Sequence, residues 1–252
     1  MKIYNVLFLV LCTIFMMSSC TFYKPSVLTT PIVEKKGEVI VGGSIGSTSD
    51  GYLLVSPVKH LAVMAEAGVA NTIESTTTVN GEEITNEVSN NNYEFSAGFY
   101  DSLSNEVLYQ VYAGYAFGKS GSLFEDAGFT VLDGLYSAEY TNPFLQANMQ
   151  FQLNYNLYLG LSARANFLEF SDFEAFEDSA FVSGTTIEAG IDDPSKFVGQ
   201  FGVDFRYRGD NFGAFAGMQY AFSPDESGYF DVRNYGIHFG IYLRVDSFFR
   251  KD

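Results

Sequence analysis

Long runs in which apolar and polar residues alternate constrain the fold of this chain more than any other feature. Over residues 145–155 the odd positions are apolar, and the even positions between them carry only Gln or Asn. Similar alternation recurs over residues 157–167, 197–207 and 235–245. Successive side chains of a β-strand point to opposite faces, so each run has one apolar and one polar face. The pattern predicts antiparallel strands whose sheet separates two different environments.

The length of these runs and the composition of their polar faces favour strands that cross a membrane. The runs extend over about 9–13 residues, whereas strands of soluble proteins average about 5–6 and tilted membrane strands about 9–11. Their polar faces are rich in Gly, Ser, Gln and Asn rather than in the Lys and Glu of a solvated surface. Only 17% of the residues are charged, against about 25% in a soluble domain. We therefore expect the apolar faces to contact lipid and the polar faces to line a lumen.

Ten strand-like runs can be identified along the chain. They occupy about residues 38–46, 51–57, 60–71, 92–101, 106–118, 143–154, 156–169, 196–208, 211–223 and 234–247. The number falls to eight if the first two runs, which contain Gly42, Gly43 and Gly46, are not strands. Short turns alternate with long connections, which fall at residues 72–91, 119–142, 170–195 and 224–233. Short turns on one side and long loops on the other are typical of outer-membrane barrels.

On this pattern, residues 38–252 resemble the small outer-membrane β-barrel family, in the broad sense of the OmpA transmembrane domain. Residues 235–241, with Phe248 and Phe249 after them, resemble the aromatic-rich last strand that serves as an assembly signal in this family. The resemblance implies an all-β fold, a single closed antiparallel up-and-down transmembrane barrel in the bacterial outer membrane. An even number of strands places both ends of the barrel on the short-turn, periplasmic side.

The N-terminus has the features of a bacterial export signal. Lys2 precedes an apolar stretch of about 15 residues, which is shorter than the ~20 residues that a membrane-spanning helix needs. The segment Met17-Ser18-Ser19-Cys20 resembles the box that lipoprotein signal peptidase cleaves, and this resemblance implies that Cys20 becomes the acylated first residue. The alternative is an ordinary secretory signal in which Cys20 is incidental.

Three parts of the chain are predicted from these features. They are a lipoprotein signal peptide at residues 1–19, a lipidated tether at residues 20–37 and the barrel at residues 38–252. Because both barrel ends are expected at the short turns, the acyl anchor on Cys20 is expected on the periplasmic side of the outer membrane.

The polar faces of the predicted strands include six ionisable residues that we expect to interact. They are Glu66, Arg164, Asp204, Arg206, His238 and Arg244. A barrel of about ten strands has a narrow interior that side chains fill, and buried charges must be paired. We therefore expect a salt-bridged, amide-lined network that plugs the lumen. A narrow, gated polar conduit is the alternative for the same residues.

The sequence predicts a structural or interaction role and no catalytic residues. The net charge of −16 excludes the basic surface that nucleic-acid binding requires. No calcium-loop spacing or phosphate-binding glycine loop is present, so neither a metal nor a cofactor is expected. The expected partners are outer-membrane lipid and outer-membrane proteins that contact the long acidic loops.

Two alternatives from other functional classes stay open. In the first, a lipid-tethered periplasmic barrel turns the apolar face of residues 145–155 inward around a hydrophobic ligand. In the second, an outer-membrane barrel enzyme, either lipid-modifying or proteolytic, uses His238 together with an acid such as Asp225 or Asp231.

Overall fold

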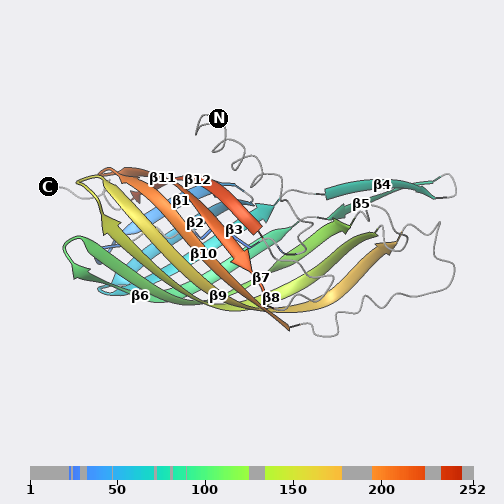
Figure 1. Cartoon of the computed structure of the whole chain (residues 1–252), viewed down its shortest axis with the longest axis horizontal. Coiled ribbons are helices and arrows are strands. Elements are labelled where there is room, and N and C mark those ends of the chain that lie inside the picture. The colour runs from blue at the N-terminus through green and yellow to red at the C-terminus, as the bar shows by residue number, and fades with distance from the viewer. Residues whose placement is uncertain are drawn as a thin grey trace, which may run out of the picture.

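The computed structural model is a closed barrel of ten antiparallel strands with a two-stranded hairpin beside it (Figure 1). It describes residues 23, 25–28, 33–46, 48–70, 73–79, 82–88, 90–124, 134–177, 195–224 and 234–245. The barrel strands are β1 (Val39–Ile45), β2 (Thr48–Val58), β3 (Leu61–Ala70), β6 (Asn91–Ser104), β7 (Val107–Phe124), β8 (Gly134–Gln152), β9 (Leu157–Glu177), β10 (Ser195–Arg208), β11 (Phe212–Phe222) and β12 (Asn234–Arg244). Each pairs with the barrel strand next to it in the chain, and β1 pairs with β12 to close the barrel. The predicted ten-stranded antiparallel barrel is confirmed.

One end of the barrel is made of short connections. They comprise residues 59–60, 105–106, 153–156 and 209–211, as the sequence predicted for the short-turn side. His60, in the first of these turns, has a φ of 67°, which is the left-handed conformation that tight turns require. This end is called the short-turn end below, and the opposite end is called the long-loop end.

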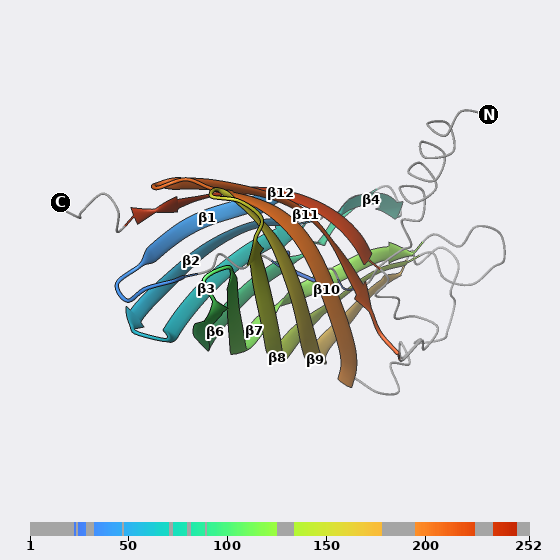
Figure 2. The ribbon, with the colours of Figure 1, turned by 60° about the vertical axis from the view of Figure 1, so that its left-hand side comes forward.

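The structure differs from the sequence prediction at the long-loop end. Strands β7, β8 and β9 have 18, 19 and 21 residues and continue as paired strands into segments that were expected to be loops (Figure 2). A hairpin of β4 (Ile73–Val79) and β5 (Glu82–Val88) lies within the predicted loop at residues 72–91. The hairpin and the long-loop ends of β7, β8 and β9 were missed because the regular alternation of apolar and polar residues along the barrel strands does not continue there. Such alternation is expected only where a strand has an apolar environment on one face and a polar one on the other. Beyond the membrane a strand can be polar on both faces.

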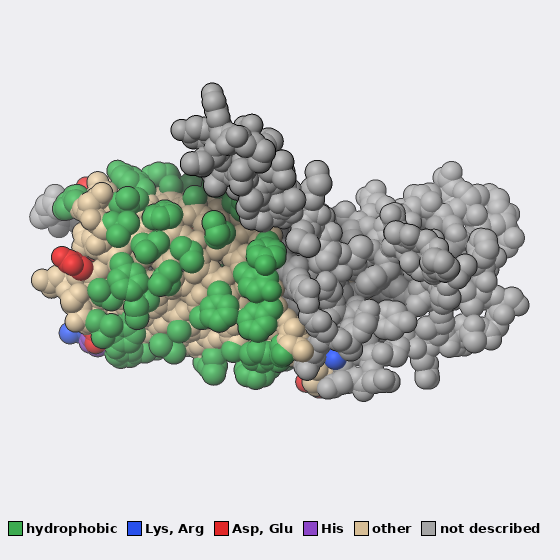
Figure 3. Space-filling model, viewed as in Figure 1, with side chains coloured by type: hydrophobic (Ala, Val, Ile, Leu, Met, Phe, Trp, Pro, Cys, Tyr) green, Lys and Arg blue, Asp and Glu red, His purple; other side chains and the backbone are tan. Residues whose placement is uncertain are grey.

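The outer face of the barrel is apolar (Figure 3). Many of the side chains buried inside the barrel are polar or charged. Leu145 and Phe201 are each 55% exposed, whereas the adjacent Gln146 and Gln200 are each 1% exposed. This arrangement is the one expected of a barrel embedded in lipid. The periplasmic barrel with an apolar interior is therefore wrong, because the apolar face of residues 145–155 points outward. Among the described residues, no helix has the length and apolar character needed to cross a membrane.

Two apolar clusters lie inside the barrel, one toward each end. The cluster toward the long-loop end contains Tyr23, Ala138, Tyr140, Leu168, Phe170, Val198 and Ala221. The cluster toward the short-turn end contains Val33, Ile40, Tyr52, Leu54, Ala62, Met64, Tyr100, Tyr112, Phe215 and Tyr242. Each cluster includes one residue from the segment that precedes β1, so this segment takes part in packing at both ends of the lumen.

Candidate functional site: a lumen occupied by the N-terminal segment

The described residues between positions 23 and 38, called the N-terminal segment below, run through the lumen of the barrel. Tyr23 packs edge to face on Tyr140, with 5.2 Å between the ring centroids, near the long-loop end. Val27 and Leu28 are buried farther along, and Val33 packs in the apolar cluster toward the short-turn end. The segment therefore passes from the long-loop end to the short-turn end, where β1 begins.

This path differs from the prediction for residues 20–37. They were expected to form a tether outside the barrel, starting from a lipid at the short-turn end. Instead Tyr23, residues 25–28 and Val33 are buried in the lumen, while residues 34–37 are exposed. The prediction failed because the segment has no periodicity of its own, and its partners lie on strands more than 60 residues away in the chain. Cys20 and residues 1–19 lie outside the described residues, so the signal peptide and the acylation stay predictions.

A buried ion pair holds the middle of the N-terminal segment. Arg164 on β9 donates through Nη1 to both carboxylate oxygens of Glu94 on β6, at 3.0 and 2.9 Å. The hydroxyl of Ser26 donates to Glu94 Oε1 at 2.5 Å and accepts from Arg164 Nη1 at 3.0 Å. Both charged side chains are only 1% exposed. Because a buried charge is stable only when it is paired and hydrogen-bonded, this cluster fixes Ser26 relative to the wall.

The guanidinium of Arg164 is also fixed by residues of the barrel wall. Its Nε donates to Gln146 Oε1 at 2.6 Å, and its Cζ lies 4.3 Å from the centroid of the Phe144 ring. Such cation–π contacts are stronger where water is excluded. Arg164 is therefore held in place for Glu94 and Ser26 by contacts that do not involve the N-terminal segment.

Glutamine side chains of the wall hydrogen-bond the backbone of the N-terminal segment. The amide of Leu28 donates to Gln219 Oε1 at 2.8 Å. The carbonyl of Ser26 accepts from Gln200 Nε2 at 3.3 Å and from Gln219 Nε2 at 3.4 Å. A chain buried away from water must find partners for its backbone groups. The glutamine side chains on the inward faces of β10 and β11 supply these hydrogen-bond partners.

Two arginines of the barrel hold two glutamates of the segment at the short-turn end. Arg244 on β12 hydrogen-bonds Glu38, and Arg208 on β10 forms an ion pair with Glu34. Arg208 Nη2 also lies 3.8 Å from Glu38 Oε1. The backbone amides of Glu34 and Lys35 donate to Glu38 Oε2, at 2.7 and 3.3 Å. Glu38 is therefore buried with partners on both carboxylate oxygens.

The structure places the six predicted lumen residues inside the barrel. In the part of the chain that it describes, Glu66 and His238 have no hydrogen-bond partner that would join them to the other four. Arg164 and Arg244 bind glutamates that the prediction did not name. Asp204 and Arg206 pair with each other on β10, where Arg206 Nη2 donates to Asp204 Oδ2 at 2.9 Å. Glu66 lies opposite Glu94 in the register of β3 and β6, and no hydrogen-bond partner of its carboxylate is found in the described part of the chain.

Several residues of the site were missed, for two different reasons. Glu94 shares the inward face of β6 with Asn92 and Ser96, so the same alternation that identified Glu66 could have identified it. Ser26, Glu34 and Glu38 precede the first strand and carry no pattern. Only the three-dimensional path of the segment brings Ser26 and Glu38 into the barrel and Glu34 to Arg208 at the short-turn end.

His238, the residue on which an enzymatic interpretation depended, is buried beside aromatic and backbone groups. Its ring centroid lies 6.0 Å from that of Phe215. Neither ring nitrogen has a hydrogen-bond partner among the residues that the structure describes, and Asp225 and Asp231 lie outside them. A general base needs a partner within hydrogen-bond reach. Within the same residues, no group of three or more His, Cys, Asp or Glu side chains is placed to hold a metal ion.

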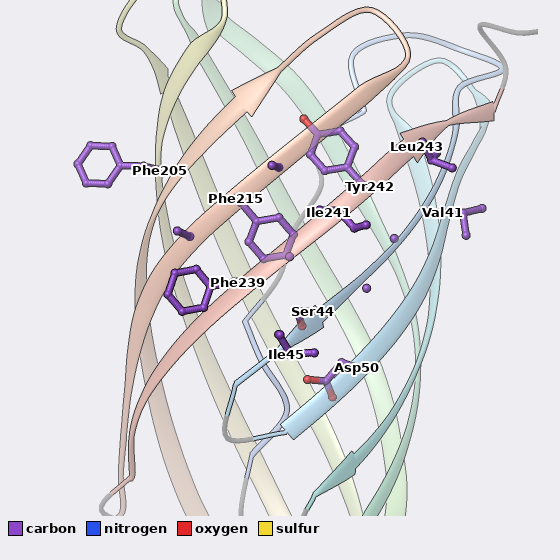
Figure 4. A pocket seen from close by; sticks show the side chains of 15 residues that line it. Val41, Ser44, Ile45, Asp50, Phe205, Phe215, Phe239, Ile241, Tyr242 and Leu243 are labelled. Carbon is purple, nitrogen blue, oxygen red and sulfur yellow. The ribbon is translucent and has the colours of Figure 1, made fainter. Parts of the chain in front are cut away.

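A shallow groove of about 1000 Å³ lies on the seam where β1 meets β12 (Figure 4). Gly42, Gly43 and Gly240 line the groove, and because they have no side chains they leave space on the surface of the strands. The outward side chains around it are apolar, and Ile45 and Phe239 are 65% and 56% exposed. The groove therefore opens on the outer, apolar surface, and the buried side chains of Ser44, Asp50, Phe215 and Tyr242 also line it.

Comparison with known proteins finds likeness at the level of structure. No family model matches the sequence, and no curated protein matches it. The Escherichia coli outer membrane protease OmpT matches with a TM-score of 0.41 and 8% identity, over 82% of this chain and 91% of that one. A KdgM porin matches with a TM-score of 0.36 and 10% identity, over 82% and 98%. The outer membrane protein OmpT of Vibrio cholerae matches with a TM-score of 0.35 and 10% identity, and this chain covers 55% of its length.

Proposed function

We propose that this protein is an outer-membrane β-barrel that its own N-terminal segment closes, and that it has a structural or interaction role. The apolar outer belt supports insertion in a membrane, because exposed side chains such as Leu145 and Phe201 would be unfavourable in water. The short turns at one end and the longer strands and connections at the other support the outer-membrane orientation, with the long-loop end outside the cell.

The observation that carries the proposal is the position of the N-terminal segment. Tyr23, Ser26, Val27 and Leu28 are each at most 2% exposed inside the barrel. A barrel of about eight strands is already filled by its side chains, and open aqueous channels appear at about sixteen strands. A ten-stranded barrel that also contains a stretch of main chain has little space left for a solute path.

The long-loop end is the part of the molecule that we assign to contacts with other outer-membrane proteins. Strands β7, β8 and β9 extend there beyond their neighbours, and the β4–β5 hairpin stands beside them (Figure 2). The net charge of −16 favours basic or cation-bridged partners over acidic ones. The acyl anchor predicted at Cys20 is part of this proposal and would keep the protein bound to the membrane.

Conductance across a planar lipid bilayer tests the proposal. The full-length mature protein should give no stable open channel. The double variant Glu34→Lys/Glu38→Lys places two positive charges beside Arg208 and Arg244, so it should release the segment and give stepwise conductance. A Glu106→Lys variant, altered in an exposed turn, should stay closed like the unchanged protein.

Two outcomes would overturn the proposal. Steady conductance by the unchanged protein would make it a pore. If the Glu34→Lys/Glu38→Lys variant kept its heat-dependent shift in SDS electrophoresis and stayed closed, the lumen would be closed by something other than the N-terminal segment.

A further inference from the structure

The direction of the N-terminal segment determines on which side of the membrane the preceding residues lie. Tyr23 contacts Tyr140, and Tyr140 contacts Phe170, with 6.1 Å between the ring centroids. Phe170 lies about 13 residues along β9 from the short-turn end of that strand at Leu157. That is about 43 Å of strand, or about 33 Å of height for a strand tilted by about 40°. Tyr23 is therefore close to the long-loop end of the lumen.

The distance from Tyr23 to Cys20 is too short for the chain to return to the other side. Three residues of fully extended chain span at most about 10 Å, which is about a third of the height from Tyr23 to the short turns. Cys20 lies outside the described residues, and the length of the chain alone limits its distance from Tyr23. Every extended or compact path leaves Cys20 nearer to the long-loop end.

The contacts of the segment also fix its direction. Glu34 and Glu38 are bound to Arg208 and Arg244 at the short-turn end, and Ser26 is bound to Glu94 and Arg164 in the middle. These two sets of contacts cannot both form if the segment runs the other way, because β1 must start at the short-turn end immediately after Glu38.

We propose that the mature N-terminus is threaded through its own barrel and emerges at the long-loop end, on the outer surface of the outer membrane. An acyl anchor on Cys20 would then enter the outer leaflet, whereas the sequence alone led us to expect it on the periplasmic side. This inference rests on the membrane insertion and orientation proposed above. It adds that the N-terminal segment crosses the membrane inside the lumen and that the lipid and the long loops lie on the same side.

Antibody access to an epitope inserted between Thr21 and Phe22 tests the inference in intact cells. The same epitope inserted after Asp210 marks the short-turn side, and one inserted after Glu188 marks the long-loop side. We expect the N-terminal epitope to bind antibody in intact cells as strongly as the epitope after Glu188. Binding only after the outer membrane is permeabilised, as expected for the epitope after Asp210, would overturn the inference.

A second measurement avoids the inserted epitope and the lipid. A variant with an ordinary secretory signal, Cys20→Ser and Thr21→Cys carries a single cysteine in its mature chain. A membrane-impermeant maleimide should label this cysteine in intact cells, and the absence of labelling until the cells are lysed would overturn the inference.

The same variant separates failure of this inference from failure of the proposed function. If the barrel gives no conductance and the cysteine is not labelled in intact cells, only the outward position of the N-terminus is contradicted. A barrel that conducts steadily, with the N-terminal cysteine hidden, contradicts the plugged lumen as well.

Discussion

The wall of the barrel and the N-terminal segment inside it are held by different kinds of interaction. The wall depends on backbone pairing around a closed ring and on an apolar belt to which many residues contribute similar, interchangeable contacts. The segment depends on a few particular side chains, above all Glu94, Arg164, Gln219 and Arg244. The barrel wall is therefore specified by the alternation of apolar and polar residues along its strands. The path of the N-terminal segment through the lumen is specified by a few individual side chains.

The largest effect should come from breaking the buried ion pair of the wall, Glu94–Arg164, to which Ser26 of the segment is hydrogen-bonded. Glu94→Gln leaves the guanidinium of Arg164 buried without its carboxylate, and removal of one partner of a buried pair costs about 3–5 kcal/mol. The free energy of unfolding, measured by urea denaturation in lipid vesicles, should fall by that amount. The double variant Glu94→Gln/Arg164→Met should recover most of the loss.

The exposed turn residue Glu106 provides the control for this prediction. Glu106→Gln removes the same charge without burial and should leave the unfolding free energy unchanged. If Glu94→Gln were as harmless as Glu106→Gln, the buried pair would not be what holds Ser26.

A charge on the outer face should damage the wall and leave the segment's contacts intact. Phe201 lies in the middle of β10 and faces outward, and an arginine on the lipid face near the middle of a bilayer costs about 2–4 kcal/mol. Phe201→Arg should therefore lower the yield of the heat-shifted, folded band in SDS electrophoresis. Asp210→Arg, in a short turn, should assemble normally, and equal assembly of the two variants would mean that Phe201 does not contact lipid.

The smallest effect should come from the partly exposed pair at the short-turn end. The side chain of Glu34 is 35% exposed, and ion pairs open to solvent contribute about 1 kcal/mol or less. Arg208→Gln should therefore lower the unfolding free energy by no more than this. The difference from the unchanged protein should shrink further in high salt, and a salt-independent loss would indicate that Arg208 acts by packing.

The strands of the wall could be predicted from the sequence because successive side chains of a strand point alternately outward and into the lumen. Leu145 faces outward and Gln146 faces the lumen, so alternation along one strand reveals both the strand and its orientation. The long-loop ends of β7, β8 and β9 were missed because the regular alternation of apolar and polar residues does not continue into them. Glu94 follows the same alternation, so it could have been predicted as a lumen residue.

The lumen contents could not be predicted in the same way. Ser26 is bound by Glu94 and Arg164, which are 68 and 138 residues away in the chain. No local pattern encodes such a contact, because it depends on which strands meet across the lumen. The sequence predicted the Gln and Asn side chains of the inner face. It did not predict that glutamines among them hydrogen-bond the backbone of the N-terminal segment.

A disulfide cross-link between the segment and the wall tests the central claim most directly. A Cβ built on Gly202 would lie 3.5 Å from Leu28 Cβ, within the range of about 3.5–4.5 Å that a disulfide needs. On oxidation, Leu28→Cys/Gly202→Cys should form a cross-link that mass spectrometry detects in the folded barrel. Leu28→Cys/Val203→Cys should form none, because Val203 faces outward. A folded, heat-shifted barrel in which residues 28 and 202 never cross-link would contradict an N-terminal segment inside the lumen.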